Sequence, residues 1–132
     1  MPKISVVSNV LQVNDAAADE NRALMQKAGA VGINIISAPG SGKTSLLQRT
    51  IPALTADRCA VLVGDLQTSR DAERLADVAA ATVQINTGSG CHLSAEQVAA
   101  GLAGLDLGGL DYVFIENVGN MVCPVSFDLG EH

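Results

Sequence analysis

Cysteine and histidine side chains lie in two short segments of the sequence, where they could bind a metal ion. Cys91 and His92 are adjacent in "INTGSGCHLSAEQ", and Cys123 lies in "VGNMVCPVSFDLGEH". Thiolate and imidazole groups suit Zn²⁺ or Ni²⁺, and three of them leave one coordination position for water, another residue or a second subunit. The residues alone leave a metal site and a chance placement equally open, and nucleophilic catalysis by a thiol is a weaker alternative. Cys59 begins an apolar run and is expected in the core.

A glycine-rich loop supplies the second candidate site. The segment "SAPGSGKT" (37–44) joins a strand-like run to a helix-like run, which is the context of a phosphate-binding P-loop. Lys43 is expected to reach the β- and γ-phosphates, and the Thr44 hydroxyl to bind Mg²⁺. Ser37 replaces the first glycine of the G-x-x-x-x-G-K-[ST] pattern. That glycine shapes the turn and does not contact the phosphate, so the replacement does not change the prediction. The alternative is an ordinary strand–turn–helix corner. The predicted nucleotide-binding residues are Pro39, Gly40, Ser41, Gly42, Lys43, Thr44 and Ser45.

Two carboxylates stand at the ends of other strand-like runs. Asp65 follows the run 59–64 directly, and Glu116 lies near the end of the run 111–117. Ligands bind outside the carboxyl ends of parallel strands, so both carboxylates are expected beside the P-loop, where they would serve Mg²⁺ directly or through water. A helix cap is the alternative for Asp65. The spacing from Glu116 to Gly119 looks like that of a loop that senses a γ-phosphate. We predict Thr44, Asp65 and Glu116 as Mg²⁺ ligands and Lys43, Asp65 and Glu116 as catalytic residues.

Strand-like apolar runs alternate with helix-like segments along most of the chain. We expect strands at 31–37, 59–64, 82–86 and 111–117, helices at 43–51, 69–80 and 94–105, and a loop from 118 to the end. This alternation predicts an α/β fold, with a parallel sheet that carries helices on both faces, of the P-loop NTPase type. Ser94 and Gln97 form a capping-box pair at the start of the last helix. An amphipathic helix is expected over 9–28, although Asn14 and Asn21 interrupt its apolar stripe.

The overall composition narrows the class of function. The chain has 132 residues, with 14 acidic against 8 basic ones and a formal charge of −6, which disfavours nucleic-acid binding. No apolar run approaches the roughly 18 residues of a membrane span, and "MPKISVVSNV" lacks the apolar core of a signal peptide. Three cysteines are an odd number, and no C-x-x-C pair occurs. We therefore expect a cytoplasmic protein with reduced thiols and no contact with membrane or nucleic acid.

Four segments resemble the HypB family of hydrogenase maturation GTPases, which assist nickel insertion into [NiFe]-hydrogenase. They are "SAPGSGKTSLLQRT", "GDLQTSRDAERL", "INTGSGCHL" and "FIENVGNMVCPVSFDLGEH", and the last two contain the most specific residues. The resemblance implies Mg²⁺ with GTP as the bound nucleotide and a homodimer in the nucleotide-bound state. It implies a nickel or zinc site near the dimer interface on Cys91, His92 and Cys123. It also implies a protein partner, either another hydrogenase maturation factor or the hydrogenase large subunit.

Two features depart from the pattern of this family. The segment "MPKISVVSNV" has neither the N-terminal cysteine motif nor the histidine-rich stretch of some members, so only the metal site of the GTPase domain is expected. The N-K-x-D motif that reads guanine is absent. We expect residues 1–30 to form an N-terminal extension and 31–132 to form the N-terminal part of a P-loop GTPase domain, truncated after its fourth strand. Two functions stay open, a GTP-hydrolysing nickel metallochaperone or a non-catalytic remnant that binds metal or a partner without turnover.

Overall fold

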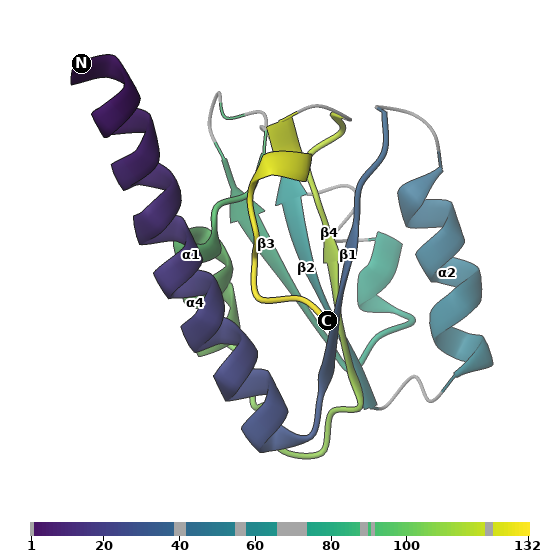
Figure 1. The fold of residues 1–132 in the computed structure, drawn as a ribbon. Coiled ribbons are helices and arrows are strands. Elements are labelled where there is room, and N and C mark those ends of the chain that lie inside the picture. Colours follow the sequence, from purple (N-terminus) through teal and green to yellow (C-terminus); the bar gives the residue numbers. More distant parts are fainter. Residues whose placement is uncertain are drawn as a thin grey trace.

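The fold is a four-stranded sheet that lies between helices (Figure 1). The computed structural model describes residues 2–38, 42–54, 58–65, 74–87, 90, 92–120 and 123–132, except for the side chains of 2–9, 65 and 123. Within these ranges the elements are α1 (Pro2–Ala28), β1 (Val31–Ile35), α2 (Lys43–Ala53), β2 (Cys59–Asp65), β3 (Ala81–Asn86), α4 (Ala95–Ala103), β4 (Tyr112–Glu116) and a 3-10 helix (Cys123–Ser126). None of the helices in the described part of the chain is both long and apolar enough to cross a membrane.

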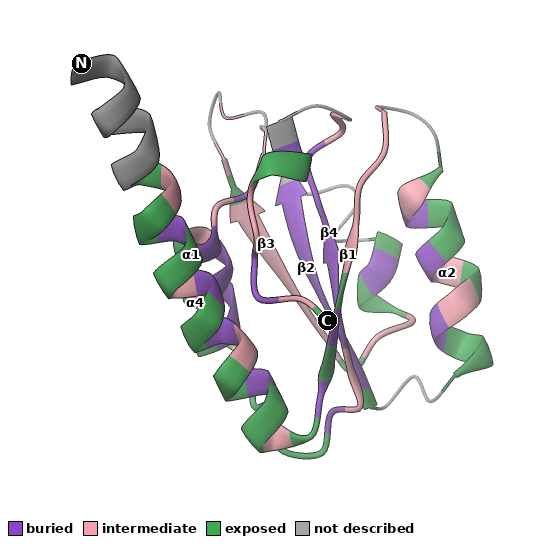
Figure 2. Cartoon of the chain, in the orientation of Figure 1, coloured by how far each residue is buried: buried purple, intermediate pink, exposed green. Residues whose placement is uncertain are grey.

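All strand pairs of the sheet are parallel, and the strand order is β1-β4-β2-β3. The central strands β2 and β4 are mostly buried, whereas β1 and β3 at the edges are partly exposed (Figure 2). Helices α1 and α4 cover one face of the sheet, and α2 covers the other (Figure 1). The structure therefore confirms the predicted α/β fold with a parallel sheet and helices on both faces.

Alternating side chains of the central strands fill one core on each face of the sheet. The core on the α1 and α4 face contains Met25, Ala60, Leu62, Leu93, Val98, Leu102, Val113, Ile115 and Leu129. The core on the α2 face contains Leu47, Ile51, Cys59, Val61, Val63, Leu75 and Phe114. Cys59 is completely buried there, as its position in an apolar run predicts.

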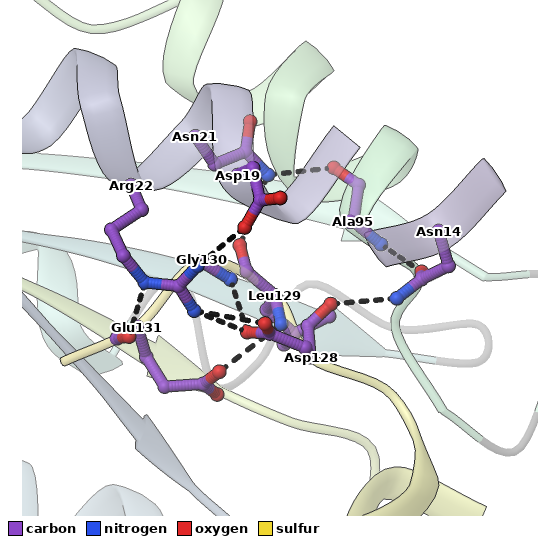
Figure 3. A network of polar contacts seen from close by, with 9 residues as sticks. All are labelled: Asn14, Asp19, Asn21, Arg22, Ala95, Asp128, Leu129, Gly130 and Glu131. Carbon is purple, nitrogen blue, oxygen red and sulfur yellow. Dashed lines mark hydrogen bonds and ion pairs between the residues drawn. The ribbon is translucent and has the colours of Figure 1, made fainter. Parts of the chain in front are cut away.

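Buried amide side chains hold α1 against α4 and against residues 128–131 (Figure 3). Asn14 donates to the Asp128 carbonyl at 2.7 Å and accepts from the Ala95 N–H at 2.8 Å. Asn21 donates to the carbonyls of Ala95 and Leu129, at 2.9 and 3.0 Å. The two asparagines that interrupt the apolar stripe of the sequence are thus its polar anchors, with the hydrogen bonds that buried amides require.

An ion pair and a close backbone contact complete this attachment. Arg22 Nη2 donates to both carboxylate oxygens of Asp128, at 2.7 and 2.9 Å (Figure 3). Gly130 has a φ of 92°, which favours glycine. A Cβ atom at this position would lie 2.5 Å from the Ala18 carbonyl oxygen and 2.6 Å from Asn21 Cβ. The segment 128–131 can pack this closely on α1 only because residue 130 has no side chain.

The structure corrects several predicted boundaries and confirms the capping box of Ser94 and Gln97. Helix α1 begins at Pro2 rather than at residue 9, and α2 continues past Pro52 to Ala53. Of the helix expected over 69–80, residues 69–73 lie outside the described ranges, and the helix in the remainder ends at residue 76. It ends early because the chain already joins the sheet at Ala80, whose N–H donates to the Cys59 carbonyl at 2.9 Å. The C-terminal stretch that was expected as a loop contains the 3-10 helix.

The ion pair of Arg22 and Asp128 should make the stability of the fold depend on pH in the acid range. Burial raises the pKa of Asp128, but the hydrogen bonds from Arg22 and the Gly130 N–H outweigh burial and leave that pKa below its usual value. The stabilisation is therefore fully present above the pKa of an unfolded aspartate, about 3.9. It is lost as the pH falls through the lower pKa of the folded state.

Urea unfolding at a series of acid pH values measures this dependence. Arg22→Met should flatten the loss of stability between about pH 5 and pH 2, because the Asp128 pKa returns toward its unfolded value. Arg58→Met, which removes the more exposed ion pair with Asp111, is the matched control and should keep the wild-type pH dependence. An Arg22→Met variant with the wild-type dependence would contradict the assignment.

Candidate functional site

The carboxyl edge of the sheet carries the predicted site residues that the structure describes. Strand β2 ends at Asp65 and β4 at Glu116, while Lys43 and Thr44 begin α2 after β1. His92 lies between β3 and α4, and Cys123 begins the 3-10 helix that follows β4. Pro39, Gly40, Ser41 and Cys91 lie outside the described residues, as do the side chains of Asp65 and Cys123.

A short hydrogen bond links the start of α2 to the end of β4. Thr44 Oγ1 donates to Glu116 Oε1 at 2.7 Å, and the two residues have exposed fractions of only 6% and 2%. Phe114 lies in the core on the α2 face, so the alternation along β4 directs Glu116 to the same face. A hydroxyl and a carboxylate oxygen are the kinds of ligand that Mg²⁺ takes in phosphate-binding sites. The pair therefore fits a magnesium ion beside a phosphate.

The start of α2 suits an anion. Gly42 has a φ of 98° and precedes the helix as its N-cap, and the Leu46 N–H donates to the Gly42 carbonyl at 2.9 Å. The first N–H groups of a helix and its dipole favour a negatively charged ligand. Lys43 is half-buried at this end. The exposed Ser45 hydroxyl accepts a hydrogen bond from Arg74 Nη2 at 3.2 Å, which ties α2 to the helical segment 74–76.

The imidazole of His92 is stacked on Phe127. The ring centroids are 4.0 Å apart, and the ring planes differ by 19°. Burial lowers the pKa of His92 and thus favours the neutral imidazole, which is the form that binds metal. The described side chains include no group of three or more His, Cys, Asp or Glu that could hold a metal ion, and the cysteines at 91 and 123 are outside that description. The stack joins the loop after β3 to the segment that follows Cys123.

The sequence prediction missed two residues of this edge, Asn117 and Leu93. Asn117 is 1% exposed, and its Oδ1 accepts from the Leu93 N–H at 3.0 Å. The Leu93 side chain lies against Gly64, where an added Cβ would be 2.7 Å from Leu93 Cγ. The available signal was a polar residue directly after the buried strand β4 and a glycine directly before Asp65. These sequence features do not predict that Asn117 and Leu93 contact each other, or that Leu93 packs against Gly64.

The parallel sheet, the glycine N-cap of α2 and the buried carboxylate beside Thr44 define a nucleotide-binding domain of the P-loop type. Residues 31–129 match the model of the CobW/HypB/UreG nucleotide-binding domain. The chain belongs to this family, and the resemblance to HypB predicted from its motifs is confirmed.

Relatives and solved structures agree with this assignment. The chain is 50% identical to the hydrogenase maturation factor HypB of Rhizobium leguminosarum bv. viciae over 130 residues, which cover 97% of this chain and 43% of that protein. It is 45% identical to the same factor of Escherichia coli K12 over 129 residues, which cover 97% and 44%. The crystal structure of HypB from Helicobacter pylori in complex with nickel has a TM-score of 0.83 and 40% identity, over 89% of this chain and 56% of that one. The chain thus spans about half the length of these relatives.

Removing the Thr44 hydroxyl should destabilise the chain when neither nucleotide nor magnesium is present. Thr44→Ala takes a hydrogen bond away from the buried Glu116 carboxylate, and the expected loss in the free energy of unfolding is about 1–3 kcal/mol. Thr44→Ser keeps the hydroxyl and loses one methyl group, which is worth about 0.8 kcal/mol. Urea unfolding in a chelating buffer measures both variants.

Thr50→Ala is the control for loss of a threonine from the same helix, where Thr50 is half-buried. An equal loss of stability in Thr44→Ala and Thr50→Ala would show that the hydrogen bond from Thr44 to Glu116 makes no specific contribution to the free energy of unfolding.

Proposed function

We propose that the chain is the nucleotide- and metal-binding part of a GTP-hydrolysing nickel metallochaperone that serves the maturation of [NiFe]-hydrogenase. The observation that carries the proposal is the buried hydrogen bond between Thr44 and Glu116 at the start of α2, on the sheet edge that also carries His92. Membership of the nucleotide-binding family supports the nucleotide. The relatives are hydrogenase maturation factors, and the HypB structure from Helicobacter pylori is a complex with nickel. They support nickel as the bound metal and hydrogenase maturation as the process that the chain serves.

In the proposed nucleotide site, the backbone N–H groups of the glycine-rich loop would cradle the phosphates, and Lys43 would pair with the β- and γ-phosphates. Thr44, Asp65 and Glu116 would hold Mg²⁺, either directly or through water. Bound magnesium would neutralise charge on the phosphate oxygens during hydrolysis. The burial of Thr44 and Glu116 keeps their oxygens in place before the nucleotide arrives. Lys43, Asp65 and Glu116 are the proposed catalytic residues.

In the proposed cargo site, Cys91, His92 and Cys123 hold nickel, with zinc as the competing ion. Neutral imidazole is already the ligand form of His92, whereas the thiols must lose protons, so binding should release protons and weaken in acid. We further propose that the nucleotide-bound state is a homodimer. The metal then passes to another maturation factor or to the hydrogenase large subunit.

Nucleotide binding does not by itself imply turnover, so we also consider a second candidate function. The N-K-x-D motif that reads guanine in this family does not occur in residues 1–132. The phosphate contacts lie close together in the sequence and do not depend on that motif. The second candidate is a domain that binds metal or a partner without turnover. Measurement of GTP hydrolysis by the chain separates the two, since only the first candidate releases phosphate.

Variants of each proposed site should lose one ligand and keep the other when the ligands are titrated separately. Lys43→Ala should weaken the binding of Mg²⁺–GTP roughly tenfold to hundredfold, because a charge-assisted hydrogen bond is worth about 1.5–3 kcal/mol. Cys91→Ser or Cys123→Ser should change the thiolate-to-nickel charge-transfer absorption. Calorimetry and absorption spectroscopy on the same preparations measure these effects.

Cys59→Ala is the matched thiol control, because Cys59 is completely buried in the core on the α2 face and should not affect the nickel spectrum. A nickel spectrum that depends on Cys59 alone would contradict the metal assignment. Binding of Mg²⁺–GTP by Lys43→Ala with wild-type affinity would contradict the nucleotide assignment.

A further inference from the structure

Two consecutive residues at the end of β4 serve opposite faces of the sheet. Glu116 accepts the hydrogen bond from Thr44 on the α2 face. Asn117 accepts a hydrogen bond from the N–H of Leu93, which belongs to the core on the α1 and α4 face. The proposed magnesium site and the loop of His92 are therefore one backbone step apart. A shift of the Glu116 backbone would move Asn117 with it, because the two residues share one planar peptide unit.

The Asn117 side chain is fixed from three directions. Its Oδ1 accepts from the N–H groups of Leu93 and Val118, at 3.0 and 2.9 Å. Its Nδ2 donates to Asn34 Oδ1 at 3.2 Å, and its backbone N–H donates to the Ile35 carbonyl at 3.1 Å. Asn34 and Ile35 belong to β1, the strand that leads to the P-loop. A buried amide with these partners joins two strand ends of the nucleotide site to the loop that follows β3.

Leu93 brings a third strand end into the same contact. It is completely buried, and its side chain fills the space above Gly64, the residue before Asp65. A Cβ atom on Gly64 would lie 2.7, 2.8 and 2.9 Å from Cγ, Cδ1 and Cδ2 of Leu93. The close approach requires glycine at position 64. Leu93 therefore contacts the ends of both strands that supply the carboxylates Asp65 and Glu116.

On its other side, Leu93 is bonded directly to His92. The His92 ring stacks on Phe127, and the Ala95 N–H donates to the Asn14 side chain at 2.8 Å. Residues 92–95 are thus held at both ends, by the stacking of His92 and by the hydrogen bond of Ala95. Leu93 is the point at which a change in the strand ends can reach His92.

We propose that Asn117 and Leu93 are positioning residues that couple the nucleotide–magnesium site to the metal-binding loop. The inference rests on the proposed function. If the contact of Glu116 with Thr44 changes when magnesium and nucleotide bind and the end of β4 shifts, Asn117 would shift too, and its hydrogen bond would carry the Leu93 N–H and the adjacent His92 with it. A ligand shifts the loop only if its two arrangements bind that ligand with different affinity. The same contact must then let nickel alter the affinity for nucleotide by the same factor.

The test is a double titration of the 132-residue chain. The dissociation constant of Ni²⁺ is measured with and without magnesium and a non-hydrolysable GTP analogue, and that of the analogue with and without Ni²⁺. The two ratios should be equal in the wild type, in the range of about 5- to 150-fold that allosteric coupling reaches. Asn117→Ala should bring both ratios close to one, while each ligand still binds alone.

Two further variants separate positioning from general structural damage. Asn117→Asp keeps an oxygen that accepts from the Leu93 N–H, and it should restore the coupling. Asn34→Ala removes only the partner of Asn117 Nδ2, and it should keep the coupling. Circular dichroism checks the fold of each variant. If Asn117→Ala does not fold, the NMR shift of the Leu93 amide on addition of the analogue decides, in the wild type and in Asn117→Asp.

The outcomes distinguish this inference from the function on which it rests. A wild-type chain that binds neither ligand overturns the proposed function and the coupling with it. A wild-type chain that binds both ligands without affecting either affinity overturns the coupling alone. Wild-type coupling in Asn117→Ala, or a Leu93 amide that does not respond to nucleotide, overturns the assignment to Asn117 and Leu93.

Discussion

The parallel direction of the four strands is the constraint on which the described structure depends. Parallel neighbours cannot be joined by a tight turn, so the chain must cross the sheet between strands, and the crossings place helices on its faces. Both faces of β2 and β4 are thereby buried, and their alternating side chains supply two separate cores. The same constraint sends the loops after all four strands to one edge. Residues far apart in the sequence therefore lie close together at this edge as a direct result of the strand direction.

Buried polar side chains give this arrangement its specificity. Among the described residues they are Asn14, Asn21, Thr44, Glu116 and Asn117. The two on α1 hold that helix to α4 and to residues 128–131, and the other three form the contacts of the carboxyl edge. A buried donor or acceptor left without a partner costs about 1–3 kcal/mol, so other packings of the same apolar residues are disfavoured. The apolar cores favour a compact sheet, and the polar contacts determine which loops touch.

The sequence predicts the features that depend on local spacing. Strand and helix alternation gives the parallel sheet, and the order of elements places Thr44 and Glu116 at the same edge, where the structure joins them at 2.7 Å. Asn14 and Asn21 could be interpreted only as breaks in an apolar stripe, because their partners Asp128 and Ala95 lie 114 and 74 residues away. The role of Asn117 is hidden for a similar reason. Strand alternation shows that it faces away from Glu116, but not that Leu93 is the residue it meets.

We propose that the nucleotide–magnesium site and the His92 loop share the carboxyl edge of the sheet. Paramagnetic broadening tests it most directly, with Mn²⁺ and a GTP analogue in place of magnesium and nucleotide. The NMR signals of the His92 ring and the Leu93 amide should broaden strongly. Those of Gly29 and Gly109, which precede β1 and β4 at the opposite edge, should stay sharp. Broadening at Gly29 and Gly109 with sharp signals at His92 and Leu93 would contradict the claim.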